Sequence, residues 1–257
     1  MTYIGTSDFG VDAARGQIGD VSTVNKFGAA TDCDSGVATD VWDGADGSTS
    51  TKVFVPPTTA RIHAIASTSA NDAAAGTGMQ QITVYGIPTD WNQPETSEDV
   101  TMNGTTPVNT VNSYVMIHRM QKKAVGSGGT NAGIITATAA TDSTVTAAIL
   151  AGNRQTLMAI YGIPSGKKLL LNRLVCTALR SVAVNVDGSL LVDDGSAIPT
   201  GGFNVKENFI FTRESPFVRD FYPPKLITGP AIVKVQVTTD ANNITCTAAF
   251  DGFVVDV

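Results

Sequence analysis

Leucine is missing from the first 149 residues of this 257-residue chain, and only 4 of its 23 acidic residues are glutamate. Both residue types favour helices, whereas the abundant threonine and valine, with 33 and 27 residues, pack well on a pleated sheet. Aromatic and charged residues are also few, at 7% and 16%. The composition therefore excludes an all-helical protein and predicts an all-β chain with one large core or two smaller ones.

Cysteine is scarce as well. Cys33, Cys176 and Cys246 lie too far apart in the sequence for a disulfide framework or a C-x-x-C metal clip, so we expect buried thiols in a reduced compartment. The N-terminus lacks a basic region and an apolar run, and no segment approaches the roughly 18 apolar residues of a membrane span. The sequence thus predicts a soluble protein that is made in the cytoplasm and has no membrane partner.

The residues that common catalytic sites need are also few. His63 and His118 are the two imidazoles, and His118 falls in a predicted strand with one solvated face. No G-x-S-x-G elbow, P-loop or G-x-G-x-x-G motif accompanies them. Two pairs of neighbouring acids are present, Glu95 with Glu98 and Asp193 with Asp194. Both pairs lie in predicted loops, where their carboxylates are not expected to face each other as a glycosidase pair does. We therefore predict a protein that is not an enzyme and has neither a catalytic residue nor a cofactor.

Metal and nucleic-acid sites are not indicated either. Five aspartates of the N-terminal segment lie close together but lack the order and the terminal glutamate of an EF-hand, so turns are expected and calcium binding stays open: Asp32, Asp34, Asp40, Asp43 and Asp46. The lysine doublets 122–123 and 167–168 are the only basic ones in a chain of net charge -6, which argues against nucleic acid.

The charge is unevenly distributed. Residues 1–50 hold eight aspartates against Arg15 and Lys26, a balance of -6, and the rest of the chain is neutral. This segment has glycine or aspartate every few residues and no apolar run longer than two. We predict an extended acidic N-terminal arm over 1–50 whose aromatic residues contact a neighbouring molecule: Tyr3, Phe9, Phe27 and Trp42.

From Thr51 onward, short β-rich runs alternate with turns. Strands are expected at 52–55, 61–67, 81–85, 100–103, 114–120, 155–161, 168–177, 181–186, 190–192, 208–212, 231–238 and 244–255. The Asn103-Gly104 pair predicts a hairpin, and the alternation on both sides of 240–243 predicts another. Segment 167–180 has an apolar helical face too, but its turn-like entry and alternating exit favour a strand.

The glycine-rich segment 126–129 is expected to be a loop or a crossing between sheets. The sequence then divides into the arm 1–50, a first β module over 51–125 and a second over 126–257, each an antiparallel β-sandwich or jelly-roll-like module. A single larger sandwich with the same strands is the alternative. The motif Tyr-Gly-Ile-Pro occurs at 85 and again at 161, which is a weak indication of an internal duplication.

Short segments distributed over most of the chain carry a resemblance to a known group: NKFG at 25–28, VWDG at 41–44, STSAND at 67–72, GTG at 76–78, VYG at 84–86, EDVTMNG at 98–104, YGIPSGK at 161–167, RDFYPP at 219–224 and FDGFVVD at 250–256. Together they resemble structural proteins of tailed-bacteriophage virions, in particular two-part β proteins. No catalytic residue comes with such a family.

The resemblance implies a virion structural protein, and we expect a capsid decoration (cement) protein. Its partners would be the major capsid protein or other virion proteins and further copies of itself. The alternative within the particle is a tail, fibre or portal-associated protein that anchors there or recognises a host receptor through aromatic loop tips, for which Trp91 and Tyr222 are the candidates. An alternative of another class is a carbohydrate-binding β-sandwich, which the low tryptophan content disfavours.

Overall fold

The computed structural model describes residues 9–47, 49, 51–179, 183–194, 199 and 201–256. As the composition predicts, the chain is all-β and its sheets are antiparallel. The helices of the described part are α1 (Phe9–Ala14) and the 3-10 turn η1 (Asp43–Ala45). Neither has the length and apolar character that crossing a bilayer requires.

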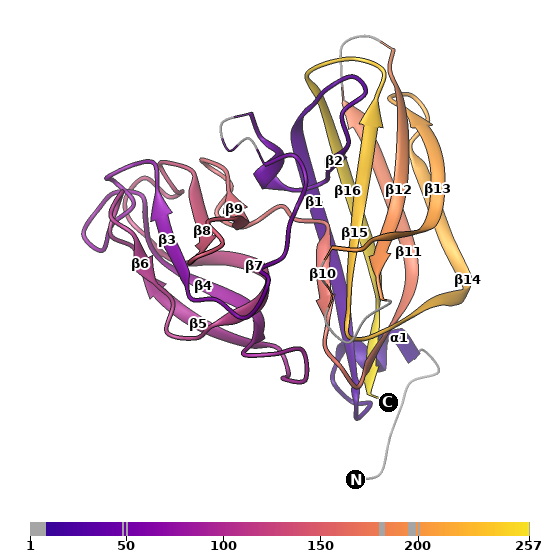
Figure 1. Cartoon of the computed structure of the whole chain (residues 1–257), viewed down its shortest axis with the longest axis horizontal. Coiled ribbons are helices and arrows are strands. Elements are labelled where there is room, and N and C mark those ends of the chain that lie inside the picture. The colour runs from indigo at the N-terminus through magenta and orange to yellow at the C-terminus, as the bar shows by residue number, and fades with distance from the viewer. Residues whose placement is uncertain are drawn as a thin grey trace.

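Four sheets form two lobes (Figure 1). In the larger lobe, one sheet has the order β1 (Val21–Cys33), β16 (Ile244–Asp256), β11 (Lys167–Leu179) and β14 (Phe217–Thr228). Its second sheet has the order β10 (Ile160–Ile163), β15 (Ala231–Thr239), β12 (Asn185–Asp193) and β13 (Asn204–Thr212), with β2 (Thr39–Asp40) paired to β15.

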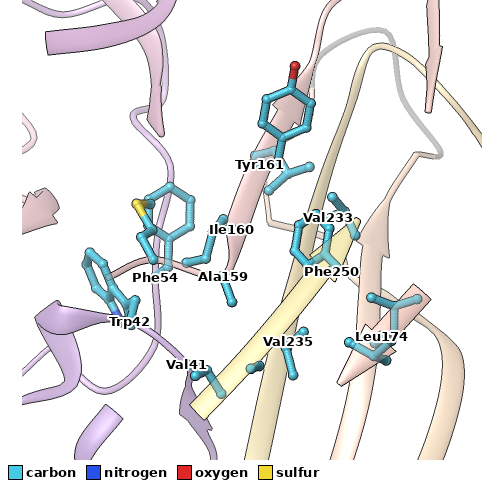
Figure 2. Close-up of a cluster of buried hydrophobic side chains, with 14 of the residues drawn as sticks. Val41, Trp42, Phe54, Ala159, Ile160, Tyr161, Leu174, Val233, Val235 and Phe250 are labelled. Carbon is cyan, nitrogen blue, oxygen red and sulfur yellow. The ribbon is translucent and has the colours of Figure 1, made fainter. Parts of the chain in front are cut away.

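Alternate residues of these two sheets share one hydrophobic core. Leu174 and Phe250 come from the first sheet, and Val233 and Val235 come from the second (Figure 2). The strand predicted at 168–177 is confirmed as β11, because leucines 169, 171 and 174 are buried in this core while the residues between them are not.

The smaller lobe also has two sheets. One has the order β6 (Val108–Asn109), β3 (His63–Ser67), β8 (Ile135–Ala139) and β9 (Val145–Ile149), and the other has the order β5 (Thr96–Thr101), β4 (Met79–Pro88) and β7 (Tyr114–Val125). Their buried residues form a second core that contains no leucine. Met79, Met102 and Met120 fill it together with isoleucine, valine and alanine, since the unbranched methionine side chain adapts to irregular gaps.

The strand pairing divides the chain differently from the predicted modules. Residues 21–33 are not an arm but strand β1, which pairs with β16 from Val21 opposite Val255 to Cys33 opposite Ile244. The whole smaller lobe is then inserted between β2 and β10, and β8 belongs with β3 rather than with the second module. The small residues of this strand hid its pattern in the sequence, and one of them, Gly28, is required by the close approach of the backbone at Val41 and Ala159.

Neither predicted hairpin forms. β15 and β16 are both present, but they lie in the two different sheets of the larger lobe, so 240–243 connects the sheets. In the same way, the Asn103-Gly104 turn connects β5 to β6, which belong to different sheets. Alternation of apolar and polar residues indicates which face of a strand is buried, but it does not identify the strand with which it pairs. A connection between two facing sheets therefore has the same sequence pattern as a hairpin.

The two Tyr-Gly-Ile-Pro segments are unrelated in topology. The first ends β4, the middle strand of its sheet, and the second lies at β10, the first strand of another sheet. They nevertheless meet where the lobes join. A Cβ on Gly86 would lie 2.2 Å from the backbone oxygen of Met116, and a Cβ on Gly162 would lie 2.8 Å from its Cγ. Both glycines therefore make room for Met116.

Candidate functional site

A pocket of about 570 Å³ lies where the two lobes meet. Its wall combines residues 22–27 of β1 and Tyr161 of β10 with residues of β4, β7 and the connection before β5. The volume falls within the ~300–1,000 Å³ that small-molecule sites occupy. We call it the inter-lobe pocket.

Lys26 is the least expected residue of the inter-lobe pocket. It is 4% exposed, and its Nζ donates a hydrogen bond to the backbone oxygen of His118 in the other lobe. It shares the buried face of β1 with Val24, Gly28 and Ala30. Burial and then the charge of Arg119 lower the pKa of Lys26 to about 7, against the opposing effect of Glu95. This lysine is therefore close to losing its proton at neutral pH.

His118 and Glu95 form a pair beside Lys26. The Nε2 of His118 lies 3.1 Å from Oε2 of Glu95, and the two side chains are 4% and 41% exposed. Burial lowers the pKa of His118, and it outweighs the attraction of Glu95. Burial also opposes ionisation of Glu95, but the interaction with His118, which includes its hydrogen bond, and the charges of Lys26 and Arg119 prevail and lower the pKa of Glu95. We conclude that a neutral imidazole donates to an ionised carboxylate.

The remaining wall is polar and aromatic. Nη2 of Arg119 donates to the backbone oxygen of Asn25 at 3.2 Å, and Nε2 of Gln121 donates to the hydroxyl of Tyr85 at 2.6 Å. The ring of Tyr161 lies 4.9 Å from that of His118. Its hydroxyl points away from the buried cluster (Figure 2). Apart from Glu95, the pocket thus combines aromatic rings with hydrogen-bonding groups that are uncharged or positive.

This arrangement is suited to binding a polar ligand. Among the described residues that line the pocket, Glu95 is the one carboxylate, and it faces the cations Lys26 and Arg119. His118 already donates its single N–H to Glu95, and its Nδ1 is buried and has no partner in the described part of the chain. Neither ring nitrogen is therefore open to a bound molecule. The face of β7 that was expected to be solvated is covered by the larger lobe.

The predicted arm residues do not form a common site. Tyr3 lies outside the described residues. Phe9 is 49% exposed and packs edge-on against Phe253, with ring centroids 5.1 Å apart. Phe27 is half-buried in β1 and lines the inter-lobe pocket. Trp42 is fully buried, so it is a core residue and not an arm contact.

The two predicted loop-tip residues have opposite outcomes. Trp91 is 4% exposed and belongs to the larger core, so it is unavailable for recognition. A tryptophan beside aspartate and asparagine suggests a loop tip, but its ring packs within van der Waals reach of Gly162 instead. Tyr222 is 100% exposed. It lies where residues 221–224 of β14 stand opposite Asn172 alone, so this part of the strand bulges.

β13 and β14 form the outer rim of the larger lobe. Each is the last strand of its sheet, and they are tied together where Nζ of Lys225 donates to the backbone oxygen of Lys206 at 2.7 Å. The rings of Phe209 and Phe217, one from each strand, stack 4.0 Å apart and form a second contact between them. Several apolar side chains of the two strands are exposed: Val205, Ile210, Val218, Tyr222 and Leu226. We call this surface the β13–β14 rim.

Three of the N-terminal aspartates pair with lysines. Asp32 and Asp34 lie 2.7 Å and 3.4 Å from Nζ of Lys52, and Asp40 pairs with Lys234. In the portion of the chain that the structure describes, no group of three histidine, cysteine, aspartate or glutamate side chains could hold a metal ion.

Sequence reasoning missed Lys26 and Arg119. Lys26 lies at every second position with Val24, Gly28 and Ala30, which predicts that it shares their buried face. This pattern is recognisable only when 21–33 is taken as a strand. No family model, curated protein or solved structure matches the chain.

Replacing Lys26 by methionine is expected to flatten the pH dependence of stability between pH 7 and pH 9. With a pKa of about 7 instead of 10.5, native Lys26 binds fewer protons in this window than the unfolded chain does. Lys26 therefore makes the free energy of unfolding of the wild type increase as pH rises, by up to about 1.4 kcal/mol per pH unit. Urea unfolding at pH 7, 8 and 9 measures the slopes. The exposed Lys122→Met is the control, and equal slopes for K26M and the wild type would contradict the assignment.

Proposed function

We propose that this chain is a non-enzymatic structural protein of a tailed-bacteriophage virion, and that it acts as a capsid decoration (cement) protein that assembles with copies of itself. The observation that carries this proposal is the strand order of the larger lobe. The assignment to a phage particle comes from the sequence resemblance, and the order of the strands supports the broader class of viral structural proteins.

Among the residues that the structure describes, the larger lobe has eight main strands when the short β2 is set aside. Numbered along the chain from one to eight, they have the order one-eight-three-six in one sheet and two-seven-four-five in the other. This is the order of one long antiparallel hairpin rolled around a core, which pairs first with last and second with seventh. We infer that the larger lobe is a jelly roll, the double-sheet fold of many viral capsid proteins and lectins. We infer for the smaller lobe a β-sandwich, because its two sheets share one core.

The β13–β14 rim supports an assembly role. A long edge strand exposes unpaired backbone groups, and β14 spans 12 residues at the end of its sheet. Pro223 and Pro224 lack a backbone N–H, so they limit the pairing of β14 with a strand of another molecule. Next to them the fully exposed Tyr222 projects as an aromatic anchor, and tyrosine is enriched among residues that dominate interface energies.

Charge on the rim favours a second copy of the chain as the occupant. The exposed Arg219 and Asp220 are adjacent, and Lys225 lies 3.0 Å from Glu207 within the rim. A two-fold contact presents the same surface from both sides, so a rim with both signs of charge can complement itself. The apolar residues between these charges then lose water on both copies at once.

Replacing Tyr222 and Leu226 together by serine is expected to abolish self-association. Both side chains are exposed, at 100% and 56%, so the fold should tolerate the change while the contact loses its apolar anchors. Sedimentation velocity over a concentration series measures the oligomer. The control is Val111→Ser, which removes an 87% exposed apolar side chain from the smaller lobe. A monomeric wild type, or an unchanged oligomer of the double variant, would overturn the assembly role of the rim.

Copy number in purified particles separates the decoration protein from the alternative. On symmetry grounds, hundreds of copies per particle indicate a decoration protein, and about six to eighteen indicate a tail, fibre or portal-associated protein. Quantitative mass spectrometry against the major capsid protein gives this number. Absence of the chain from particles would overturn the virion assignment.

A further inference from the structure

The inter-lobe pocket carries more positive than negative charge, and its other groups are neutral hydrogen-bonding and aromatic side chains. We infer that it binds a small monoanion that carries hydroxyl groups, for which an acidic sugar of the uronate type is the fitting chemical class. This binding activity goes beyond the proposed assembly role and does not depend on it, because the β13–β14 rim supplies none of the residues that line the pocket.

Two cations and one carboxylate set the charge of the ligand. Lys26 and Arg119 lie near Glu95, which is ionised and already accepts from His118. Glu95 neutralises one of the two cations, and a ligand with one negative charge neutralises the other. A dianion such as sulfate would be repelled more strongly by Glu95 in the same wall. The planar guanidinium of Arg119 also matches a carboxylate, which it can bind through two parallel N–H groups.

The uncharged part of the wall indicates hydroxyl groups on the ligand. Nδ2 of Asn25 already donates to Asp251, and Nε2 of Gln121 already donates to Tyr85. The amide oxygens of Asn25 and Gln121 can still accept from ligand hydroxyls, and the phenol groups of Tyr85 and Tyr161 can donate to them. The rings of the two tyrosines add apolar surface to the same pocket. A sugar ring carries hydroxyl groups at its edge and C–H groups on its faces, so both kinds of wall find a partner. A short aliphatic carboxylate would leave the polar groups unused.

Protonation of Lys26 couples binding to pH. Of the groups that face it, Arg119 stays charged. His118 and Glu95 have lowered pKa values, and Tyr161 has a raised one, so none of the three changes charge between pH 6.5 and 8.5. Lys26, with a pKa of about 7, loses its proton across that range. A bound anion stabilises the ammonium, so we expect affinity to fall about tenfold from pH 6.5 to 8.5.

Isothermal titration of the full chain with four compounds tests this inference. Glucuronate, glucose, acetate and sulfate are titrated at pH 6.5, and glucuronate again at pH 8.5. We expect glucuronate to bind at least tenfold more tightly than the other three and to weaken at the higher pH. Equal binding of glucose, acetate or sulfate overturns the proposal, as does an absence of binding by all four or an unchanged affinity at pH 8.5.

Two substitutions connect the binding to the pocket. Arg119→Gln should weaken glucuronate binding at least tenfold, and the half-exposed position of Arg119 makes it tolerable for the fold. Lys26→Met should remove the pH dependence of binding. Arg173→Gln, at an exposed arginine of β11, is the matched control and should bind as the wild type does. Unchanged binding by R119Q would place the ligand elsewhere and overturn the proposal.

Discussion

Replacing Gly28 by alanine is expected to lower the free energy of unfolding by at least about 3 kcal/mol, although it adds only a methyl group. A Cβ at this position would lie 2.3 Å from both the backbone nitrogen of Ala159 and the backbone oxygen of Val41. These two atoms are hydrogen-bonded to each other at 3.0 Å, so the methyl group would separate them. Because backbone atoms cannot turn aside as a side chain can, β1 would have to move away from the backbone segments that contain Val41 and Ala159.

Urea unfolding of G28A beside Gly19→Ala measures this effect. Gly19 precedes the same strand and has no positive φ, and a Cβ at this position would meet no atom within 4 Å. Its replacement should therefore change stability by no more than about 0.5 kcal/mol. Coinciding unfolding midpoints for the two variants would contradict the close approach at Gly28.

Replacing Lys234 by methionine is expected to cost about 3 to 5 kcal/mol at neutral pH. Nζ of Lys234 lies 2.6 Å from Oδ2 of Asp40, and their side chains are 2% and 0% exposed. Asp40 also accepts from the backbone nitrogen of Phe54 at 2.7 Å and from Nε2 of Gln236 at 2.8 Å. Without the lysine, these two neutral donors would be left to stabilise a buried carboxylate.

The destabilisation by K234M is expected to decrease as pH falls. Burial raises the pKa of Asp40, and removal of Lys234 raises it further, so the carboxyl group of K234M takes up a proton as pH falls. The neutral acid is easier to bury, and the destabilisation relative to the wild type should shrink toward pH 5.

A double variant and an exposed pair serve as controls for K234M. Asp40→Asn combined with Lys234→Met removes both charges and should recover part of the loss. Lys52→Met breaks a pair with Asp32 whose side chains are 23% and 25% exposed, and should cost less than about 1 kcal/mol. Thermal or urea unfolding at pH 5 and pH 7 measures all three. An equal loss for K234M and K52M would contradict the special role of the buried pair.

The local sequence carries information on strands and turns, but little on partners. The alternation around 240–243 correctly indicates two strands and a turn, and Asn243 has a positive φ as a turn residue there can. Whether the next strand continues in the same sheet or in the facing one is decided by the global path of the chain. The expected hairpins at 103–104 and 240–243 were wrong for this reason.

The pocket was inaccessible to sequence reasoning for a similar cause. The hydrogen bond from Lys26 to His118 joins residues that are 92 positions apart. Each is unremarkable in its own segment, and the lowered pKa of Lys26 arises only when the two lobes meet. In contrast, the exposure of Tyr222 was predictable, because two prolines follow it and disfavour a buried central strand.

The pairing of β1 with β16 has a consequence for biosynthesis. Asn25 and Asp251, which face each other in this pair, are separated by 226 positions, so the first long strand leaves the ribosome well before its partner exists. The intervening smaller lobe is made of nearer contacts and can fold during that wait. Pairing of β1 with β16 is then a late and slow step, because it closes a large loop. A chain released from the ribosome before β16 is made would expose β1 without a partner. Nascent chains should thus need most of their length before they resist proteolysis at residues 21–33.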